Sequence, residues 1–295
     1  KQTVCLVEVQ ARFDEERNIQ WARALERAGV HVDYGLSGLK THEKLAMVVR
    51  REGDRVRRYV HIGTGNYNPA TARLYTDMGL FTCRDDLTED VADLFNHLTG
   101  FGRPPEYRST LVAPMHLRNG IIGEIDRVVA AHRPESPSRV VMKLNSLIDG
   151  PVIQAIYRAS QAGVPVDLIV RGIAGLRPGI PGVSENVRVI SIVGRFLEHA
   201  RVFAFPADGE TRYYIGSADM MARNLDNRVE LVTPIDDPIA TREIQAVLDL
   251  QLADTALVGE LGPDGGWAHR VTPAGEEPGN SQEALMARAA QAGRG

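Results

Sequence analysis

The sequence has few cysteines and no long hydrophobic run. Among 295 residues only Cys5 and Cys83 are cysteines, and neither has metal-ligand spacing, which argues against a disulfide scaffold and favours a reducing cytoplasm. No apolar run approaches the roughly 20 residues that span a bilayer, and Lys1-Gln2-Thr3 does not begin a signal peptide, so we expect no transmembrane segment. We therefore expect a soluble, cytoplasmic protein, with peripheral association with the inner membrane left open.

The composition is that of a globular protein without a strong charge. Hydrophobic residues make up 43% of the chain, which is enough for a sizeable core and two domains, and which excludes disordered and collagen-like classes. The net charge is −4, so any affinity for a polyanion must come from local clusters of basic residues. We expect no nucleic-acid partner.

The first third of the chain has the pattern of a β-α-β unit followed by a hairpin. An apolar strand over residues 3–9 precedes a helix over 13–28 with acidic residues in its first turn, and Gly29 is the expected C-cap. A strand over residues 30–34 completes the unit, so a parallel pair with a right-handed crossover is predicted. Two further strands, over 42–51 and 56–62, are joined by a turn at residues 52–54.

A second α/β region follows a break in the pattern. A helix over 88–98 precedes a Gly- and Pro-rich segment at 100–105, and we place a domain boundary near Tyr107. This gives a first domain at residues 1–107, which carries His42, and a second at 108–295, which carries His199 and ends in a flexible tail. In the second domain the pattern predicts helices over 118–132, 152–161 and 282–291, a strand over 140–144 and a surface loop between Arg171 and Val193.

A possible phosphate site lies in the first domain. His42 and Lys44 are two residues apart on a predicted strand, so both side chains point to one face. A neutral imidazole is a usable nucleophile, and a neighbouring cation can hold a phosphoryl group beside it. The loop Gly63-Thr64-Gly65-Asn66 lets backbone N–H groups approach an anion. Taken alone these signals are weak, because a single histidine on a strand is more often structural.

The same pattern occurs a second time in the second domain. His199 and Arg201 repeat the spacing of His42 and Lys44, and residues 213–219 repeat residues 59–65. Asn224, which follows the second loop, is the polar counterpart of Asn66 in the first. This repetition predicts an internal duplication with one bilobed site between two facing histidines. The alternative, that both are satisfied core histidines, would have to explain why a cation accompanies each.

These residues resemble a known family, the type 1 polyphosphate kinases. The resemblance extends over residues 1 to about 260 and is carried by several motifs, which lie at residues 11–15, 39–44, 59–68, 71–77, 170–172, 195–199 and 220–230. It implies an α/β fold of two tandem phospholipase D-like domains related by internal duplication, with the first domain truncated at its N-terminus.

The family implies ATP-dependent, reversible synthesis of inorganic polyphosphate through a phosphohistidine, with ATP, ADP and polyphosphate as partners. By position, His42 matches the phosphorylated nucleophile and His199 the second essential histidine. Tyr75 and Arg171 match nucleotide-contacting residues, and Arg12 matches an arginine assigned to the magnesium site. Since a guanidinium cannot ligate Mg²⁺, Arg12 is expected to bind phosphate oxygens that the metal also touches.

The sequence departs from related patterns in two ways. Family members carry two further domains upstream, so this chain by itself is expected to be weakly active or inactive, and the full-length protein is expected to form a homo-oligomer. The aspartate that phospholipase D enzymes place seven residues after each histidine is replaced by Val49 and Pro206, which argues against phosphodiester hydrolysis.

Three functional hypotheses remain at this point. In the first, a kinase, His42 attacks the γ-phosphorus of ATP, while Lys44, Arg171, Arg201, Asn66 and Asn224 hold phosphate oxygens. The second is a phospholipase D-like phosphodiesterase, and the third is a polyanion-binding fragment without turnover. Five arginines around one hairpin fit either a solvated strand face or a channel for polyphosphate; they are residues 50, 51, 55, 57 and 58.

Overall fold

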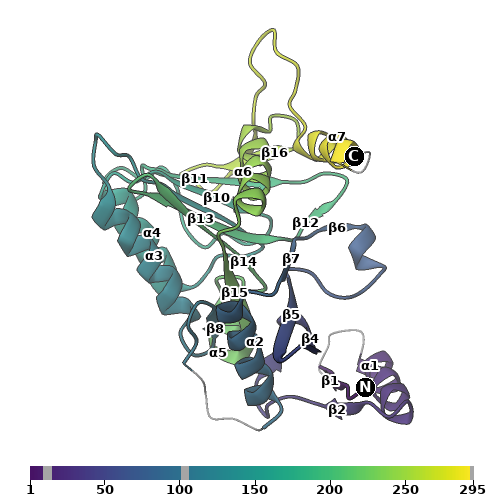
Figure 1. The fold of residues 1–295 in the computed structure, drawn as a ribbon. Coiled ribbons are helices and arrows are strands. Elements are labelled where there is room, and N and C mark those ends of the chain that lie inside the picture. The colour runs from purple at the N-terminus through teal and green to yellow at the C-terminus, as the bar shows by residue number, and fades with distance from the viewer. Residues whose placement is uncertain (9–14, 101–105, 293–295) are drawn as a thin grey trace.

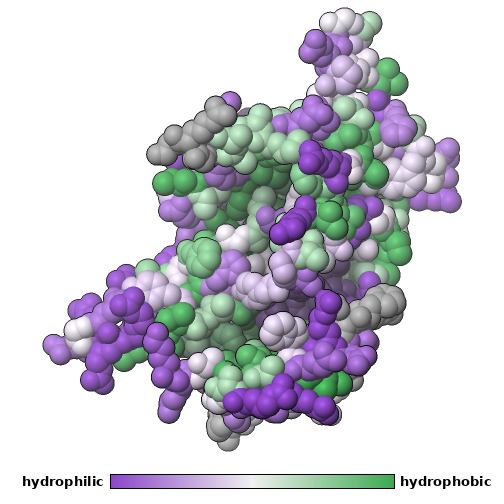
Figure 2. Space-filling view, turned by 90° about the vertical axis from the view of Figure 1, so that its right-hand side faces the viewer, coloured by the Kyte–Doolittle hydropathy of each residue, from purple (hydrophilic) through white to green (hydrophobic). Residues whose placement is uncertain are grey.

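The fold is a mixed α/β arrangement centred on one large sheet (Figure 1). The computed structural model describes residues 1–8, 15–100 and 106–292. Among these residues no helix is both long enough and apolar enough to cross a lipid bilayer. The face in Figure 2 is a mosaic of hydrophilic and hydrophobic residues, with the hydrophilic ones gathered on the parts that project.

The large sheet is formed mainly by the second half of the chain. Its central strands, β9 and β10, are parallel and fully buried, as expected for runs of Val, Leu and Ile covered on both faces. In spatial order the sheet contains β17 (Trp267–His269), β16 (Val258–Leu261), β11 (Val187–Ile192), β10 (Val166–Val170), β9 (Val140–Leu144), β13 (Arg201–Ala207), β14 (Glu210–Gly216), β15 (Arg228–Ile235) and β3 (Lys40–Thr41), with β8 (Leu111–Ala113) also paired to β15.

Helices cover both faces of this sheet. Alternate residues of β9 belong to different cores: Met142 packs with α3 (Leu117–Ala131) and α4 (Gly150–Gln161), while Val141 packs with α6 (Pro238–Ala253). The side chains of Asp149 and Asp237 cap α4 and α6 by accepting backbone N–H bonds in the first turn. The sheet therefore lies between two layers of helices.

The first half of the chain forms smaller sheets. Strands β1 (Val4–Leu6) and β2 (His31–Asp33) are parallel and joined through α1 (Glu15–Arg27), which confirms the predicted β-α-β unit. Strands β4 (Lys44–Glu52), β5 (Arg55–Gly63) and β7 (Gly79–Thr82) form an antiparallel sheet. Helix α2 (Asp85–Leu98) packs on it in a core that includes Val60 and Ile62 from the first half and Val229 and Leu231 from the second.

The internal duplication predicted from the sequence is confirmed. The hairpin β4–β5 corresponds to β13–β14, and each hairpin pairs with a third antiparallel strand, β7 in the first half and β15 in the second. The other short elements are η1 (Thr71–Arg73), α5 (Ala222–Asn227) and α7 (Ser281–Ala292), and α7 packs near α6.

Two short parallel strand pairs cross between the halves. Strand β3 of the first half pairs with Arg228 and Val229 at the start of β15. Strand β12 (Leu197–Glu198) of the second half pairs with β6 (Tyr75–Thr76) of the first, and the two lie side by side in Figure 1. Each histidine motif is therefore held by a strand from the opposite half.

The prediction of a surface loop between Arg171 and Val193 is wrong for residues 187–192. Residues 187–192 form β11, which pairs with β10 on one side and β16 on the other, and whose Val187, Val189 and Ile190 are buried. Because glycines and prolines precede this strand, the sequence pattern predicts a loop. Its alternating apolar residues are typical of a strand that is buried in a sheet.

Candidate functional site

His42 is held against a buried carboxylate from the other half of the chain. It follows β3, and its backbone N–H donates to the carbonyl of Val229 at 3.0 Å. This register brings its Nδ1 to 2.8 Å from Oε2 of Glu230, the residue after Val229. Glu230 is fully buried and also accepts bonds from the hydroxyl of Ser217 at 2.5 Å and from Nδ2 of Asn224 at 2.7 Å.

Burial and the neighbouring charges set the protonation state of the His42 imidazole and of Glu230. Burial lowers the pKa of His42 to about 4, so the ring is neutral at pH 7. Although burial opposes it, the pairing with His42, the nearby charge of Lys44 and the hydrogen bond from Ser217 hold the pKa of the Glu230 carboxyl below its usual value. A neutral ring beside an ionised carboxylate carries its proton on Nδ1, which leaves the lone pair on Nε2.

Lys44 lies beside the histidine backbone and away from the ring. Its ammonium donates to the carbonyl of His42, and the residue is only 6% exposed. Burial lowers the pKa of Lys44 to about 8, which keeps most of it charged at pH 7. Burial is the largest cause that lowers the pKa of His42 and of His199, and the charge of Lys44 is a smaller cause that lowers both. Both imidazoles therefore lie within the field of one ammonium.

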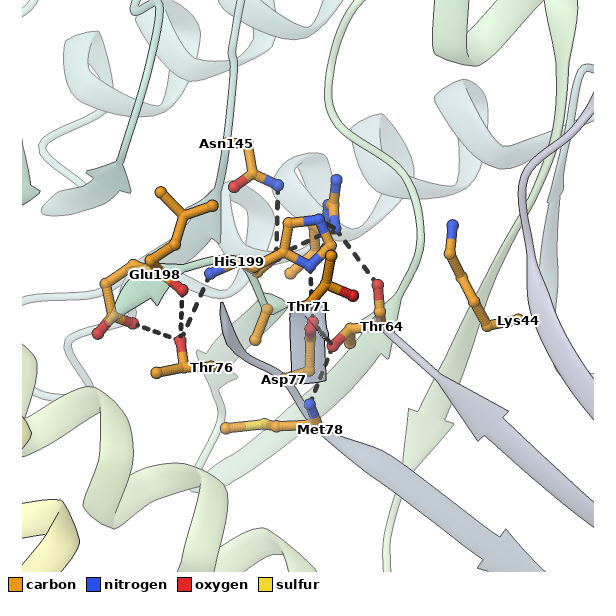
Figure 3. A network of polar contacts seen from close by, with 12 residues as sticks. Lys44, Thr64, Thr71, Thr76, Asp77, Met78, Asn145, Glu198 and His199 are labelled. Atoms are coloured by element: carbon orange, nitrogen blue, oxygen red, sulfur yellow. Dashed lines mark hydrogen bonds and ion pairs between the residues drawn. The ribbon is translucent and has the colours of Figure 1, made fainter. Parts of the chain in front are cut away.

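His199 repeats the arrangement with the halves exchanged (Figure 3). It follows β12, and its backbone N–H donates to the carbonyl of Thr76 at 3.3 Å. Its Nδ1 lies 2.8 Å from Oδ1 of Asp77, the residue after Thr76, and Asp77 also accepts a bond from the hydroxyl of Thr64 at 2.7 Å. Gly65 is required here, because a Cβ at this position would lie 2.1 Å from the Asp77 carboxylate.

The two histidines differ at Nε2. Arg201 Nη1 lies 3.1 Å from Nε2 of His199, and Arg201 Nη2 donates to Asp219 at 3.1 Å. No described residue forms a hydrogen bond with Nε2 of His42. Nη1 of Arg201 also lies 3.4 Å from Nδ1 of the His199 ring and donates to the carbonyl of His199 at 3.0 Å, so the guanidinium lies against that ring. Nε2 of His42 has no such neighbour among the described residues, and its lone pair can attack an electrophile.

The other predicted site residues are distributed around this pair. The ring of Tyr75 lies 5.0 Å from that of His199, centroid to centroid. Nε of Arg171 donates to Asn145 at 2.8 Å. The pKa of Arg171 is lowered mainly by burial and secondly by the charge of Arg201. Asn66 is exposed.

Asn224 has a structural contact in addition to its predicted role. It is buried, and its Nδ2 donates to Glu230, so it orients the carboxylate that holds His42. Its phosphate contact and that of Asn66 stay predictions.

The charges around the two histidines favour an anion. Besides burial, the charge of Arg201 lowers the pKa of Lys44, Arg171 and Arg228, which places four cationic side chains in one region. Phosphoryl oxygens would relieve this mutual repulsion.

The described residues do not fit a metal site held by protein ligands. Arg12, the residue expected at a magnesium site, lies outside the described residues. Within residues 1–8, 15–100 and 106–292 there is no cluster of three or more His, Cys, Asp or Glu side chains that could hold a metal. The carboxylates of Asp77, Asp219 and Glu230 already accept bonds from protein donors.

The basic hairpin is solvent-facing at its tip. Arg50 and Arg57 lie opposite each other on β4 and β5 with side chains 63% and 51% exposed, and both lie within 4 Å of Glu52. The geometry leaves both interpretations of the hairpin open.

The carboxylates were the part of the site that the sequence analysis missed. A signal was present: Asp77 is the thirteenth residue after Thr64, and Glu230 is the thirteenth residue after Ser217. The repeat therefore continues past the glycine-rich loops to a hydroxyl and an acid in each half.

We expect Asp219→Asn to destabilise the fold by about 3 kcal/mol, because it leaves the buried Arg201 guanidinium without its charged partner. Asp219 also accepts backbone bonds from Asn145 at 2.7 Å and Ser146 at 3.3 Å. Urea unfolding measures the change. Asp226→Asn is the matched control, since that carboxylate is 46% exposed in its pair with Arg118 and should cost under about 1 kcal/mol. Equal losses would contradict the prediction.

Comparison with known families gives a match over nearly the whole chain. The model of "Polyphosphate kinase C-terminal domain 2" matches residues 110–282, and that of "Polyphosphate kinase C-terminal domain 1" matches residues 1–104. The chain belongs to the polyphosphate kinase family. It contains the family's two C-terminal domains.

Named relatives agree with this assignment. The polyphosphate kinase of Thermosynechococcus vestitus is 54% identical over 98% of this chain and 39% of its own length. That of Streptomyces coelicolor is 53% identical over 97% of this chain and 38% of its own. This polyphosphate kinase chain thus spans about two fifths of the length of the curated relatives it matches.

Solved structures support the fold. The crystal structure of polyphosphate kinase from Porphyromonas gingivalis is similar with a TM-score of 0.90 at 35% identity, over 99% of this chain and 44% of that one. Phosphatidylserine synthase from Haemophilus influenzae has a TM-score of 0.58 at 12% identity, over 99% of this chain and 81% of that one, which is a likeness of fold alone. The predicted duplication of two α/β units is confirmed.

Proposed function

We propose that this chain carries the phosphotransfer site of an ATP–polyphosphate phosphotransferase that works through a phosphohistidine. The observation that supports this best is the state of His42, a neutral imidazole whose Nδ1–H is held by Glu230 and whose Nε2 has no hydrogen-bond partner among the described residues. An oriented nucleophile beside a cluster of cations is what phosphoryl transfer requires.

The proposed reaction has two displacements. Nε2 of His42 attacks the γ-phosphorus of ATP, so that a P–N bond forms while the bond to the β-phosphate oxygen breaks and ADP leaves. A terminal oxygen of polyphosphate then attacks the same phosphorus, and the P–N bond breaks. Glu230 stabilises the positive charge that develops on the ring during the attack. Both steps are reversible.

The remaining predicted residues take supporting roles in this proposal. Lys44, Arg171, Arg201, Asn66 and Asn224 hold phosphate oxygens, directly or by orienting a neighbour, and Tyr75 contacts the nucleotide. The His199 ring is oriented by Asp77, and when it is protonated its Nε2–H donates to the transferred group and stabilises charge there. One preorganised donor of this kind contributes about 3 kcal/mol to lowering a barrier.

Magnesium is proposed as a cofactor that arrives on the nucleotide. Because the described carboxylates are already bonded to protein groups, Mg²⁺ would be held by phosphate oxygens, and Arg12 would bind those same oxygens. We further propose a cytoplasmic homo-oligomer of the full-length protein with no nucleic-acid partner.

The test uses γ-labelled ATP. Label that is acid-labile and base-stable, and that maps to His42, supports the proposal, and its absence from both this chain and the full-length protein contradicts it. Polyphosphate binding without ATP turnover would favour a polyanion-binding fragment. Cleavage of a chromogenic phosphodiester would favour the phosphodiesterase, which Val49 and Pro206 disfavour.

The low pKa of His42 predicts an unusual titration. Since its pKa is about 4, the ring stays neutral above that value and keeps its nucleophilic form from pH 8 down to pH 5, whereas a free histidine with a pKa near ~6.5 would protonate in this range. We expect the ¹⁵N imidazole shifts of His42 to remain constant between pH 8 and pH 5. A midpoint above pH 6 would contradict this prediction.

A further inference from the structure

A buried polar cluster lies directly behind His199. At its centre is Glu198, whose Oε2 is 3.0 Å from Nζ of Lys143, 2.7 Å from Nε2 of Gln251 and 3.0 Å from the hydroxyl of Thr76, while its Oε1 accepts a bond from Nε2 of Gln282 at 2.8 Å. Glu198, Lys143, Gln251 and Gln282 are each at most 3% exposed. Although burial opposes it, Lys143 holds the pKa of Glu198 below its usual value, while burial lowers the pKa of Lys143 against the attraction of Glu198. The 3.0 Å contact therefore pairs two buried ionisable groups.

The cluster occupies a defined place relative to the site. Glu198 and Thr76 are paired residues of β12 and β6, and the next residue on each strand is His199 or Asp77. In the twin strand pair, β3 with β15, the corresponding residues are Thr41 and Val229, whose side chains cannot form an ion pair.

Gln282 connects the cluster to the C-terminal helix. Its side-chain amide binds the backbone of Phe196 on both sides, since Oε1 accepts the N–H at 3.0 Å and Nε2 donates to the carbonyl at 2.9 Å. Its amide therefore acts as a one-residue strand partner next to β12. Gly194 makes room for it, because a Cβ at that position would lie 2.6 Å from Oε1 of Gln282.

We propose that Gln282 is a positioning residue for the phosphotransfer site. From α7 it holds residues 196–198 in place, so that β12 stays paired with β6, His199 stays against Asp77, and Tyr75 stays beside the His199 ring. Within the described part of the chain, the backbone of Phe196 has no hydrogen-bond partner other than this amide, and residues 193–196 form no helix, so α7 supplies the restraint. The kinetic consequence rests on the proposed function, whereas the structural consequence does not.

The experiment compares Gln282→Met with Gln291→Met in the full-length protein. Methionine keeps the length of the side chain and removes all three hydrogen bonds, and Gln291 is an exposed residue of the same helix. We expect Gln282→Met to abolish or shift the downfield Nδ1–H resonance of the His199–Asp77 hydrogen bond. We also expect it to slow phosphorylation of His42 on the order of ten- to a hundred-fold, as misplacement of a supporting group does. Gln291→Met should change neither.

Several outcomes would overturn the proposal. Retention of both the resonance and the rate would do so, and so would a slower rate with an unchanged resonance, because the effect would then reach the site by another route. If Gln282→Met does not fold, Gly194→Ala displaces the amide without altering Gln282 and is judged by the same two measurements. If the wild-type protein takes up no label, the proposed function fails, while the resonance still decides whether Gln282 positions His199.

Discussion

Replacing His42 with asparagine abolishes phosphohistidine formation, since no other described imidazole combines a neutral ring, a carboxylate on Nδ1 and an unbonded Nε2. The loss of label should exceed about 10⁴-fold, because the side chain that accepts the phosphoryl group is gone. Among the residues that the structure describes, its ring makes one polar contact, with Glu230 at 2.8 Å, so few other interactions are lost. Mass spectrometry of base-treated peptides after incubation with labelled ATP measures the result.

The matched control for His42→Asn is His31→Asn. His31 is exposed on β2, and its replacement should leave the label unchanged. If the label persists in His42→Asn, another residue is the nucleophile. In that case His199 is the first residue to examine, although Arg201 already contacts its Nε2 at 3.1 Å.

Replacing Glu230 with glutamine should slow phosphorylation of His42 by roughly 10²- to 10⁴-fold. The amide keeps the shape of the side chain but can donate to Nδ1, which stabilises the tautomer whose Nε2 carries a proton and is not nucleophilic. The variant also loses the negative charge that stabilises the ring during attack. Single-turnover labelling measures the rate, and thermal unfolding shows whether the fold is retained.

Asp77→Asn provides the comparison for this prediction. It makes the same chemical change at the twin carboxylate, 2.8 Å from Nδ1 of His199, whose Nε2 is already engaged. We expect a smaller effect than for Glu230→Gln. If Asp77→Asn costs more than Glu230→Gln, the assignment of nucleophile and supporting histidine is reversed.

The crossed geometry explains how a duplicated chain can build two unlike centres. Each half supplies one histidine and the carboxylate for the other histidine, so neither half contains a complete pair. One difference between the centres is lysine at position 44 and arginine at position 201: the Lys44 ammonium donates to the carbonyl of His42, whereas the Arg201 guanidinium donates to the carbonyl of His199 and also lies against its ring.

Local sequence patterns were sufficient for much of the fold and part of the site. The β-α-β unit, most helices and the duplicated hairpins follow from periodicity and capping residues, which act within a few positions along the chain. The repeated spacing of His42 with Lys44 and His199 with Arg201 indicated where chemistry lies. The prediction that His42 and Lys44 share one face of a strand is wrong, because His42 lies between β3 and β4 and Lys44 donates to the His42 carbonyl away from the ring. Strand β11 was missed because the Gly- and Pro-rich segment that precedes it has the composition of a loop.

The sequence by itself determined that the chain is duplicated and that each copy carries a histidine, a cation and a glycine-rich loop. Only the tertiary structure decided which acid serves which histidine, which Nε2 is free, and that Gln282 lies behind His199. The reason is distance along the chain: His42 meets Glu230 188 residues away, and Gln282 meets Glu198 84 residues away. Contacts of that kind depend on how strands of the two halves pair, and local patterns do not encode that pairing.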